Sequence, residues 1–116
     1  MKETLQPGLS SVATYVVTED MSPPHLPTKV LSTPDMIRLI EQTCLLLAQD
    51  HLGEGQTTVG IHVCVSHVAP AECGEEVAVA CELTDRDRKK LTFTTTVTCG
   101  ERTLSEGTHD RFVVGG

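Results

Sequence analysis

The chain has 116 residues, which is the length of one ordinary domain, and it carries a formal net charge of −7. An acidic surface repels both the phosphate backbone of nucleic acids and anionic membranes, and no apolar run approaches the roughly 20 residues of a membrane span. We therefore predict a single domain over residues 1–116, with no nucleic-acid partner and no membrane association.

The start of the chain and the cysteines bear on location. The first residues, MKETLQPGLSS, contain no apolar stretch of the kind found in secretory signals. The five cysteines are an odd number without a CxxC pair, so we expect reduced, buried thiols. Cys64 and His67 are close in sequence, but nothing else suggests a metal site. These features predict a cytoplasmic protein without a metal site.

The first half of the chain predicts a strand, a loop and a helix. Residues 11–17 favour a strand, and three prolines in residues 18–31 indicate a loop that could act as a lid. The helix is expected over residues 32–52, with Ser32 or Thr33 as the cap and Pro34 in the first turn. Its apolar residues cover more than half of its circumference, so we expect other structure to wrap it.

The second half predicts four antiparallel strands, over residues 57–68, 76–84, 90–99 and 103–114. The charged string DRDRK, residues 85–89, is expected to form a turn, and Gly107 a bulge or kink. Helix and strands are segregated along the chain, so the fold class is α+β, with an antiparallel sheet of about five strands around one central helix. Exposed sheet edges would favour pairing with a second subunit.

Two residues of the helix leave two interpretations open. Glu41 lies at the border of the apolar arc, where it could pair with Arg38 or point into a cleft. Thr33 could simply cap the helix, or its hydroxyl could bind a carbonyl or a developing oxyanion at the positive helix end.

Two residues of the following strand are also ambiguous. Alternation places His67 in phase with Val59, Ile61, Val63 and Val65, on the face that covers the helix. There it could be a satisfied core histidine or a general base. Gly60 indicates either a bulge or a close approach by a ligand. One basic cluster, Arg86 and residues 88–90, could be a solvated turn or could attract a phosphorylated ligand.

Three separated strings, STPDMIRLIEQTC, EGQTTVGIHVCVSHVAP and GTHDRFVV, resemble the hotdog-fold thioesterases, and within them the fluoroacetyl-CoA thioesterase-like family. The likeness extends from about Tyr15 to Val114. It implies a hotdog fold, in which a curved sheet wraps the long helix, and homodimers that hydrolyse acyl-CoA thioesters without a metal, with active sites at the subunit interface. Coenzyme A would enter only as part of the substrate, and dimers could assemble further into tetramers.

The resemblance also implies roles for individual residues. Thr33, Glu41 and His67 match the catalytic set of the family, Gly60 matches the glycine that binds the thioester carbonyl, and Arg111 matches the arginine of the closing motif. His67 would act as general base, and Glu41 would orient the attacking water or act as nucleophile.

One segment departs from the family. Fluoroacetyl-CoA enzymes carry phenylalanines before the threonine, whereas this chain has PPHLPTKVLS, so we expect a different, small or medium acyl group. Two alternatives to a thioesterase are a non-catalytic dimer that binds acyl-CoA or another small ligand, and a dehydratase or hydratase on the same fold.

Overall fold

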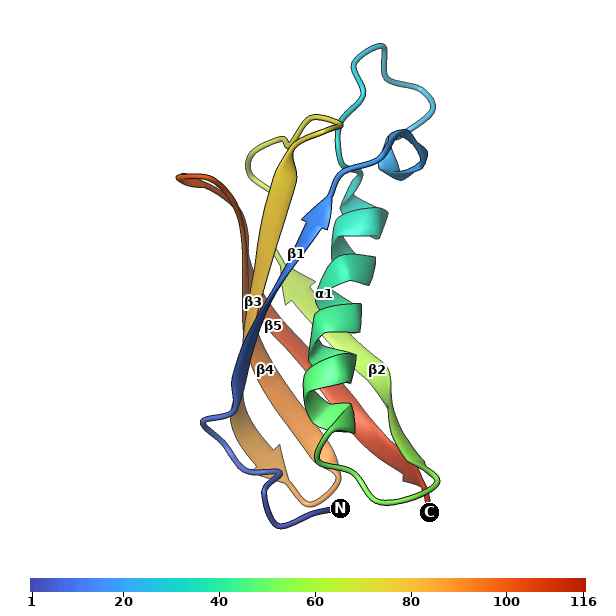
Figure 1. The fold of residues 1–116 in the computed structure, drawn as a ribbon, viewed down its shortest axis with the longest axis vertical. Coiled ribbons are helices and arrows are strands. Elements are labelled where there is room, and N and C mark those ends of the chain that lie inside the picture. Colours follow the sequence, from blue (N-terminus) through green and yellow to red (C-terminus); the bar gives the residue numbers. More distant parts are fainter.

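The computed structural model describes all 116 residues and consists of one long helix packed against a curved antiparallel sheet (Figure 1). The helix is α1 (Thr33–Gln49), and a single 3-10 turn, η1 (Glu19–Met21), precedes it. The strands are β1 (Ser10–Val16), β2 (Gln56–Val65), β3 (Glu76–Asp87), β4 (Lys90–Cys99) and β5 (Arg102–Gly115). Their order in the sheet is β1-β3-β4-β5-β2, which leaves β1 and β2 as edges. The predicted α+β hotdog architecture is confirmed.

The start of α1 follows from local chemistry. The Ser32 hydroxyl accepts a hydrogen bond from the backbone N–H of Asp35 at 3.2 Å, and Pro34 occupies the first turn. Ser32 is therefore the cap, and Thr33 is left free for another contact. The helix ends at Gln49, earlier than the predicted residue 52, and the chain continues through turns to β2.

The helix is less completely wrapped than the sequence predicts. One side packs on the sheet, while Leu46 on the other side is 55% exposed. The buried side of the helix consists of Met36, Leu39, Ile40, Thr43, Cys44 and Ala48. The expectation of a fully wrapped helix is thus wrong for a single chain, because one five-stranded sheet covers only one side of it.

The core lies between α1 and the inner face of the sheet. Alternate residues of β3 and β4 are buried there, and Phe93 is the largest of them. Twenty apolar residues form this single cluster, which fits the scarcity of aromatic residues in the chain.

Three strand details differ from the sequence predictions. Strand β2 ends at Val65 rather than at residue 68, and β3 continues to Asp87, so the turn occupies only residues 88–89. The irregularity predicted at Gly107 lies instead at Leu104, where the register with β4 shifts. Gly107 is needed for a different reason: a Cβ there would lie 2.1 Å from the carbonyl oxygen of Cys64 on β2.

No helix in the structure has the length and apolar character needed to cross a membrane.

Candidate active site

Glu41 stands in the middle of α1 and meets Arg111 of β5. Its Oε2 atom lies 3.6 Å from Nη1 of Arg111, and the side chains are 41% and 6% exposed, so the carboxylate is accessible while the guanidinium is buried. The alternative pairing with Arg38 is wrong, because Arg38 contacts Asp35 instead, at 3.3 Å. The remaining interpretation is a carboxylate that is held by a buried cation and is open to a ligand.

All three nitrogens of the Arg111 guanidinium have partners in the sheet. Nε donates to Thr58 Oγ1 at 2.7 Å, Nη2 to the Thr58 carbonyl at 3.0 Å, and Nη1 to Nε2 of His109 at 3.0 Å. Since arginine can only donate, His109 accepts at Nε2, and its Nδ1–H donates to the carbonyl of His62 at 2.8 Å. Burial lowers the pKa of His109, and the charge of Arg111 acts in the same direction. A neutral His109 therefore fixes the orientation of Arg111.

His109 is a site residue that sequence reasoning missed. It lies in the string GTHDR and precedes Arg111 by two positions, so both side chains face the same side of β5. That spacing, beside a buried arginine, is the signal that could have identified it. Its place behind Arg111 makes it a positioning residue, because it contacts the guanidinium and not the open side of Glu41.

A β-bulge at Ile61 turns Gly60 toward Glu41. Gly60 is paired with Arg111, whereas His62 is paired with Asp110, so Gly60 and His62 face opposite sides of the sheet. A Cβ at Gly60 would lie 2.6 Å from Oε2 of Glu41 and 3.2 Å from Cε1 of His109. The predicted bulge is present, and the missing side chain also lets the carboxylate approach the strand.

Because of the same bulge, the side chains of β2 do not divide between the two faces of the sheet as the sequence predicts. Val59 is paired with Phe112, lies away from the helix and is 45% exposed, and the unpaired Ile61 is 50% exposed. Val63 is paired with the buried His109 and faces the helix side. The expectation that Val59, Ile61, Val63 and Val65 share one face is wrong, because the extra residue changes the phase of the strand.

Thr33 and His67 meet at the beginning of α1. Thr33 Oγ1 lies 2.7 Å from Nδ1 of His67, and in the tautomer with an unprotonated Nδ1 the hydroxyl donates. Burial lowers the pKa of His67, while the backbone of Ala69 opposes this shift. His67 lies beyond the end of β2, so its position comes from the connecting loop and not from strand alternation. The threonine is not the helix cap, and the histidine has a specific polar partner.

Within one chain, the predicted residues form two clusters. Thr33 and His67 lie at the start of α1, whereas Glu41, Gly60 and Arg111 lie near its middle. Eight helical residues separate Thr33 from Glu41, which corresponds to about 12 Å along the axis. Thr33 of the first cluster borders a cavity of about 600 Å³ between the helix start and residues 20–25 of the loop. Figure 1 shows this loop projecting beyond the start of α1, where a lid would stand.

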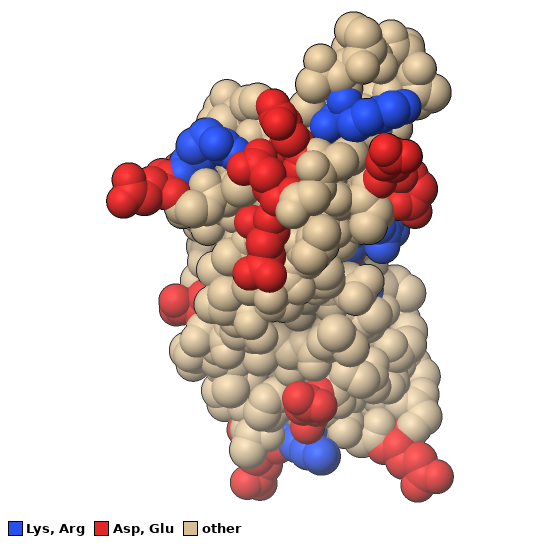
Figure 2. Space-filling model, turned by 45° about the horizontal axis from the view of Figure 1, so that its top comes forward, with Lys and Arg blue, Asp and Glu red and all other residues tan.

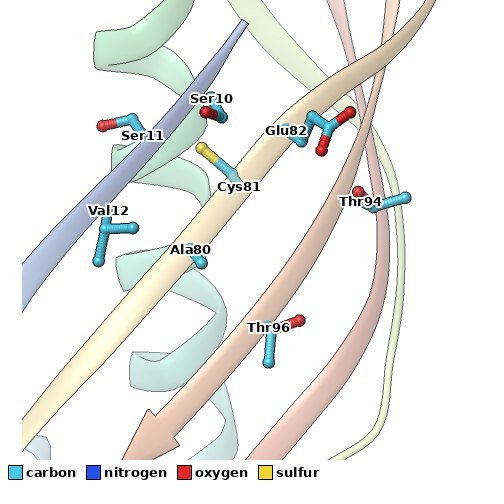
Figure 3. Close-up of a pocket in the computed structure, with 8 residues that line it drawn as sticks. All are labelled: Ser10, Ser11, Val12, Ala80, Cys81, Glu82, Thr94 and Thr96. Atoms are coloured by element: carbon cyan, nitrogen blue, oxygen red, sulfur yellow. The ribbon is translucent and has the colours of Figure 1, made fainter. Parts of the chain in front are cut away.

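Other chemistry-bearing groups lie outside these clusters. All five cysteines are free; a hydrogen bond with Cys81, together with burial, raises the pKa of the Cys44 thiol and keeps it protonated. No group of three or more His, Cys, Asp or Glu side chains converges as metal ligands would. A shallow groove of about 210 Å³ runs over β1, β3 and β4 (Figure 3), and none of the predicted site residues borders it.

Comparison with known proteins gives a family for nearly the whole chain. The sequence profile of a family described as fluoroacetyl-CoA-specific thioesterase, FlK, matches residues 16–116. A fluoroacetyl-CoA thioesterase from Streptantibioticus cattleyicolor is 29% identical over 86 residues. That match covers 74% of this chain and 62% of the relative, so it spans less than two thirds of that protein.

Solved structures agree with this match. The fluoroacetyl-CoA thioesterase FlK superposes with a TM-score of 0.90 at 24% identity, covering 97% of this chain and 90% of FlK. A mutant of FlK in complex with fluoroacetate and CoA has a TM-score of 0.88 at 25% identity, with 95% of each chain covered. A thioesterase superfamily member from Thermus thermophilus shares the fold alone, with a TM-score of 0.89 at 19% identity, covering 97% of this chain and 86% of the other.

Proposed function

This chain belongs to the family of fluoroacetyl-CoA-specific thioesterases, and from this premise we propose that it hydrolyses an acyl-CoA thioester to the free acid and CoA. The observation that carries the proposal is the accessible Glu41 carboxylate, held by the buried Arg111 and facing a strand that lacks a side chain at Gly60. A carbonyl carbon placed beside Gly60 would lie within reach of this carboxylate, or of a water that it orients.

The proposed chemistry divides the roles among five residues. His67 removes a proton from the attacking water, and its lowered pKa keeps the imidazole unprotonated near pH 7, the form that can accept a proton. The water oxygen bonds to the carbonyl carbon, the C–S bond breaks, and the thiolate of CoA leaves and takes up the proton. Thr33 and Gly60 polarise the carbonyl, and Glu41 either orients the water or attacks as nucleophile. Arg111 holds the carboxylate in place.

The two clusters are proposed to act together in a homodimer. A 12 Å separation along α1 is too large for Thr33 and Glu41 of one chain to touch one reacting atom. Strand β2 is an open edge of the sheet, Val63 on its helix side is 36% exposed, and Leu46 on the helix is 55% exposed, so a second copy that pairs along this edge would bury apolar surface. In such a two-fold assembly, the Thr33–His67 pair of one subunit would complete the Glu41–Gly60 cluster of the other.

The acyl group is proposed to be small or medium. The loop over the start of α1 carries no aromatic residue, and the nine residues that line the cavity there include three prolines and no phenylalanine. The fluoroacetyl group for which the related enzymes are named is therefore not the expected substrate.

The first test is a panel of acyl-CoAs, from acetyl to long-chain and aryl, with chromogenic detection of released thiol and a blank for the native cysteines. We expect turnover of a short or medium chain that is lost in Glu41→Gln and His67→Ala. The exposed Gln42, next to Glu41 on the helix, provides the matched control as Gln42→Ala. Full activity in both site variants would refute these roles, and a thermal shift without turnover would indicate a binding protein instead.

A mixing experiment tests the shared site. Glu41→Gln and His67→Ala are each expected to be inactive, yet a heterodimer of the two would contain one intact site if the residues act across the interface. Random pairing should then restore about a quarter of wild-type activity. No recovery after verified subunit exchange would place Glu41 and His67 of the same chain in one site. Light scattering after gel filtration would give the oligomeric state.

A further inference from the structure

Two side chains of types that bind metal ions stand on the edge strand β2, outside the proposed catalytic set. Cys64 is the exposed one among the five free cysteines, and its thiol forms no hydrogen bond, in contrast to the thiols of Cys73 and Cys99. The side chain of His62 is 61% exposed, and its polar contact is with Asp110. Both groups are therefore available to a ligand.

His62 and Cys64 share the outer face of the sheet. Asp110 is paired with His62 and is followed on β5 by Arg111, whose side chain faces α1. His62 therefore points away from α1, and alternation along β2 places Cys64 on the same face. His62 Nδ1 lies 4.0 Å from Oδ2 of Asp110, and the same oxygen lies 3.9 Å from Nζ of Lys90. A carboxylate beside one ring nitrogen is the usual neighbour of a metal-binding histidine, because it orients the ring and leaves the other nitrogen for the metal.

One chain supplies too few ligands for a closed site. Structural zinc sites hold the ion with four ligands, and two thiolates with two imidazoles are a common set. Within the chain, no third His, Cys, Asp or Glu side chain joins this pair as a metal ligand would. A second copy of the same strand would supply the two ligands that are missing.

The dimer proposed above sets the register between two β2 strands. The bulge places Gly60 and His62 opposite consecutive residues of β5, so Gly60 lies three rungs from Cys64. In the other direction His67 lies three residues beyond Cys64, and the backbone N–H groups on either side of His67 still donate to β5 carbonyls. An antiparallel pair of β2 strands centred on Cys64 therefore brings His67 of one subunit opposite Gly60 of its partner, as the shared active site requires.

This register gathers the outer-face ligands of both strands around the two-fold axis. Cys64 lies opposite Cys64 of the partner subunit, and directly opposed Cβ atoms in a sheet are about 4.5–5.5 Å apart. His62 of each chain stands two residues from this pair, one on either side of it and on the same face. Two thiols flanked by two imidazoles form the donor set of a tetrahedral zinc site.

The charge of the molecule favours a cation over an anion at these side chains. Each chain carries a formal net charge of −7, and Figure 2 shows acidic side chains gathered on the upper part of the face that it presents. Asp110 adds a carboxylate directly beside His62. Thiolate and imidazole ligands in turn select zinc over magnesium or calcium, which prefer oxygen ligands.

We propose that the dimer binds one zinc ion on its two-fold axis, through Cys64 and His62 of each chain. The inference rests on the proposed function, because the shared active site fixes the register of the two strands. Each thiol releases its proton to solvent when the metal binds. The ion holds the two edge strands together on the face opposite Glu41 and takes no part in hydrolysis. The sequence suggests no metal site because each chain contributes only two of the four ligands.

The deciding experiment is zinc titration of the reduced, metal-free, full-length protein in competition with a chromogenic chelator. We expect one zinc ion per two chains, and at least about hundredfold weaker binding in Cys64→Ser and in His62→Gln. Asp110→Asn keeps all four ligands and should weaken binding about tenfold. The matched control is Cys73→Ser, a partly exposed thiol on a loop, which should bind zinc as the wild type does. No zinc bound by the wild type, or equal binding by Cys64→Ser, would overturn the proposal.

Oxidation tests the register without zinc. With the metal removed, copper–phenanthroline should take two electrons and two protons from the opposed Cys64 thiols and join the two chains by a disulfide. The covalent dimer should form in the wild type and in Cys73→Ser, and bound zinc should slow its formation. A wild type that stays uncrosslinked, or a Cys64→Ser variant that crosslinks equally, would overturn the proposed register.

The zinc site and the proposed hydrolysis can fail separately. Cys64→Ser should keep the kcat of the wild type at concentrations at which light scattering shows a dimer, because Cys64 lies on the face opposite Glu41. A wild type that cleaves no acyl-CoA but binds one zinc ion per two chains would refute the proposed function alone. An active wild type that binds no zinc would refute the zinc site alone.

Discussion

Replacement of Gly60 by alanine tests whether catalysis depends on the close approach of Glu41 to the edge strand. A Cβ at this position would lie 2.6 Å from Glu41 Oε2, and ordinary contacts begin at 3.4 Å, so the carboxylate must retreat by about 0.8 Å. The carboxylate can move, because 41% of its side chain is exposed. Arg111 cannot follow it, because its guanidinium is anchored to Thr58 and His109.

The size of the effect follows from this geometry. A displacement of about 1 Å in a reacting group can cost about 10²-fold in rate, so kcat/KM of Gly60→Ala should fall by roughly that factor. Stability should change little, by less than about 1 kcal/mol, since the alanine also restricts the unfolded chain. The assay is thiol release from the best acyl-CoA of the panel, with thermal unfolding measured on the same samples.

Two other glycines provide controls. Gly53→Ala also places a Cβ against a flexible side chain, 3.2 Å from Gln56 Oε1, but far from the site, and should keep full activity. Gly107→Ala meets rigid backbone, 2.1 Å from the Cys64 carbonyl, and should destabilise the fold. The reasoning is refuted if Gly60→Ala retains wild-type kcat/KM with normal stability, because the position of the carboxylate would then not limit the reaction.

Four further predictions follow from the polar contacts. Thr33→Val removes the hydroxyl beside His67 and should lower kcat/KM at least tenfold. The protein should stay folded, since Ser32 is the cap. Equal kcat/KM values for the wild type and the variant would count against a role for the hydroxyl. Conversely, Ser32→Ala should reduce the free energy of unfolding by about 1 kcal/mol in denaturant titrations. The acid limb of kcat/KM should lie below pH 6.5, because burial lowers the pKa of His67; a midpoint above that value would exclude His67 as the neutral base. Burial also lowers the pKa of His109, so as the pH falls below 6.5 the unfolded chain takes up a proton before the folded chain does, and the stability of the fold declines. His109→Asn should flatten this decline in thermal unfolding. An unchanged slope of stability against pH would contradict the prediction.

The agreement between sequence and structure is clearest at the start of α1 and in β4. Ser32, Pro34 and Asp35 define the start of the helix from interactions within one turn, and the structure places it there. Strand β4 occupies Lys90–Cys99, as its composition and flanking turn residues predict. These signals are local, since each depends on residues only a few positions apart, and such signals can be recognised in a single sequence.

The site residues were predicted only through resemblance to a family. Composition and spacing alone left Glu41, Thr33 and Gly60 with two interpretations each. The structure removed the pairing of Glu41 with Arg38 and the capping role of Thr33, and it showed that Gly60 is both beside a bulge and against the Glu41 carboxylate. Their catalytic roles stay predictions until the variants are measured.

By itself, the sequence determined the order of the elements, the start of the long helix and the antiparallel class of the sheet. Only the tertiary structure decided which faces meet. The bulge at Ile61 reverses the phase of β2, and it brings Gly60 to Arg111 while it turns the His62 carbonyl to His109. The physical reason is that these contacts join residues about 50 positions apart. Their geometry depends on how neighbouring strands align, and one inserted residue changes every side chain that follows it.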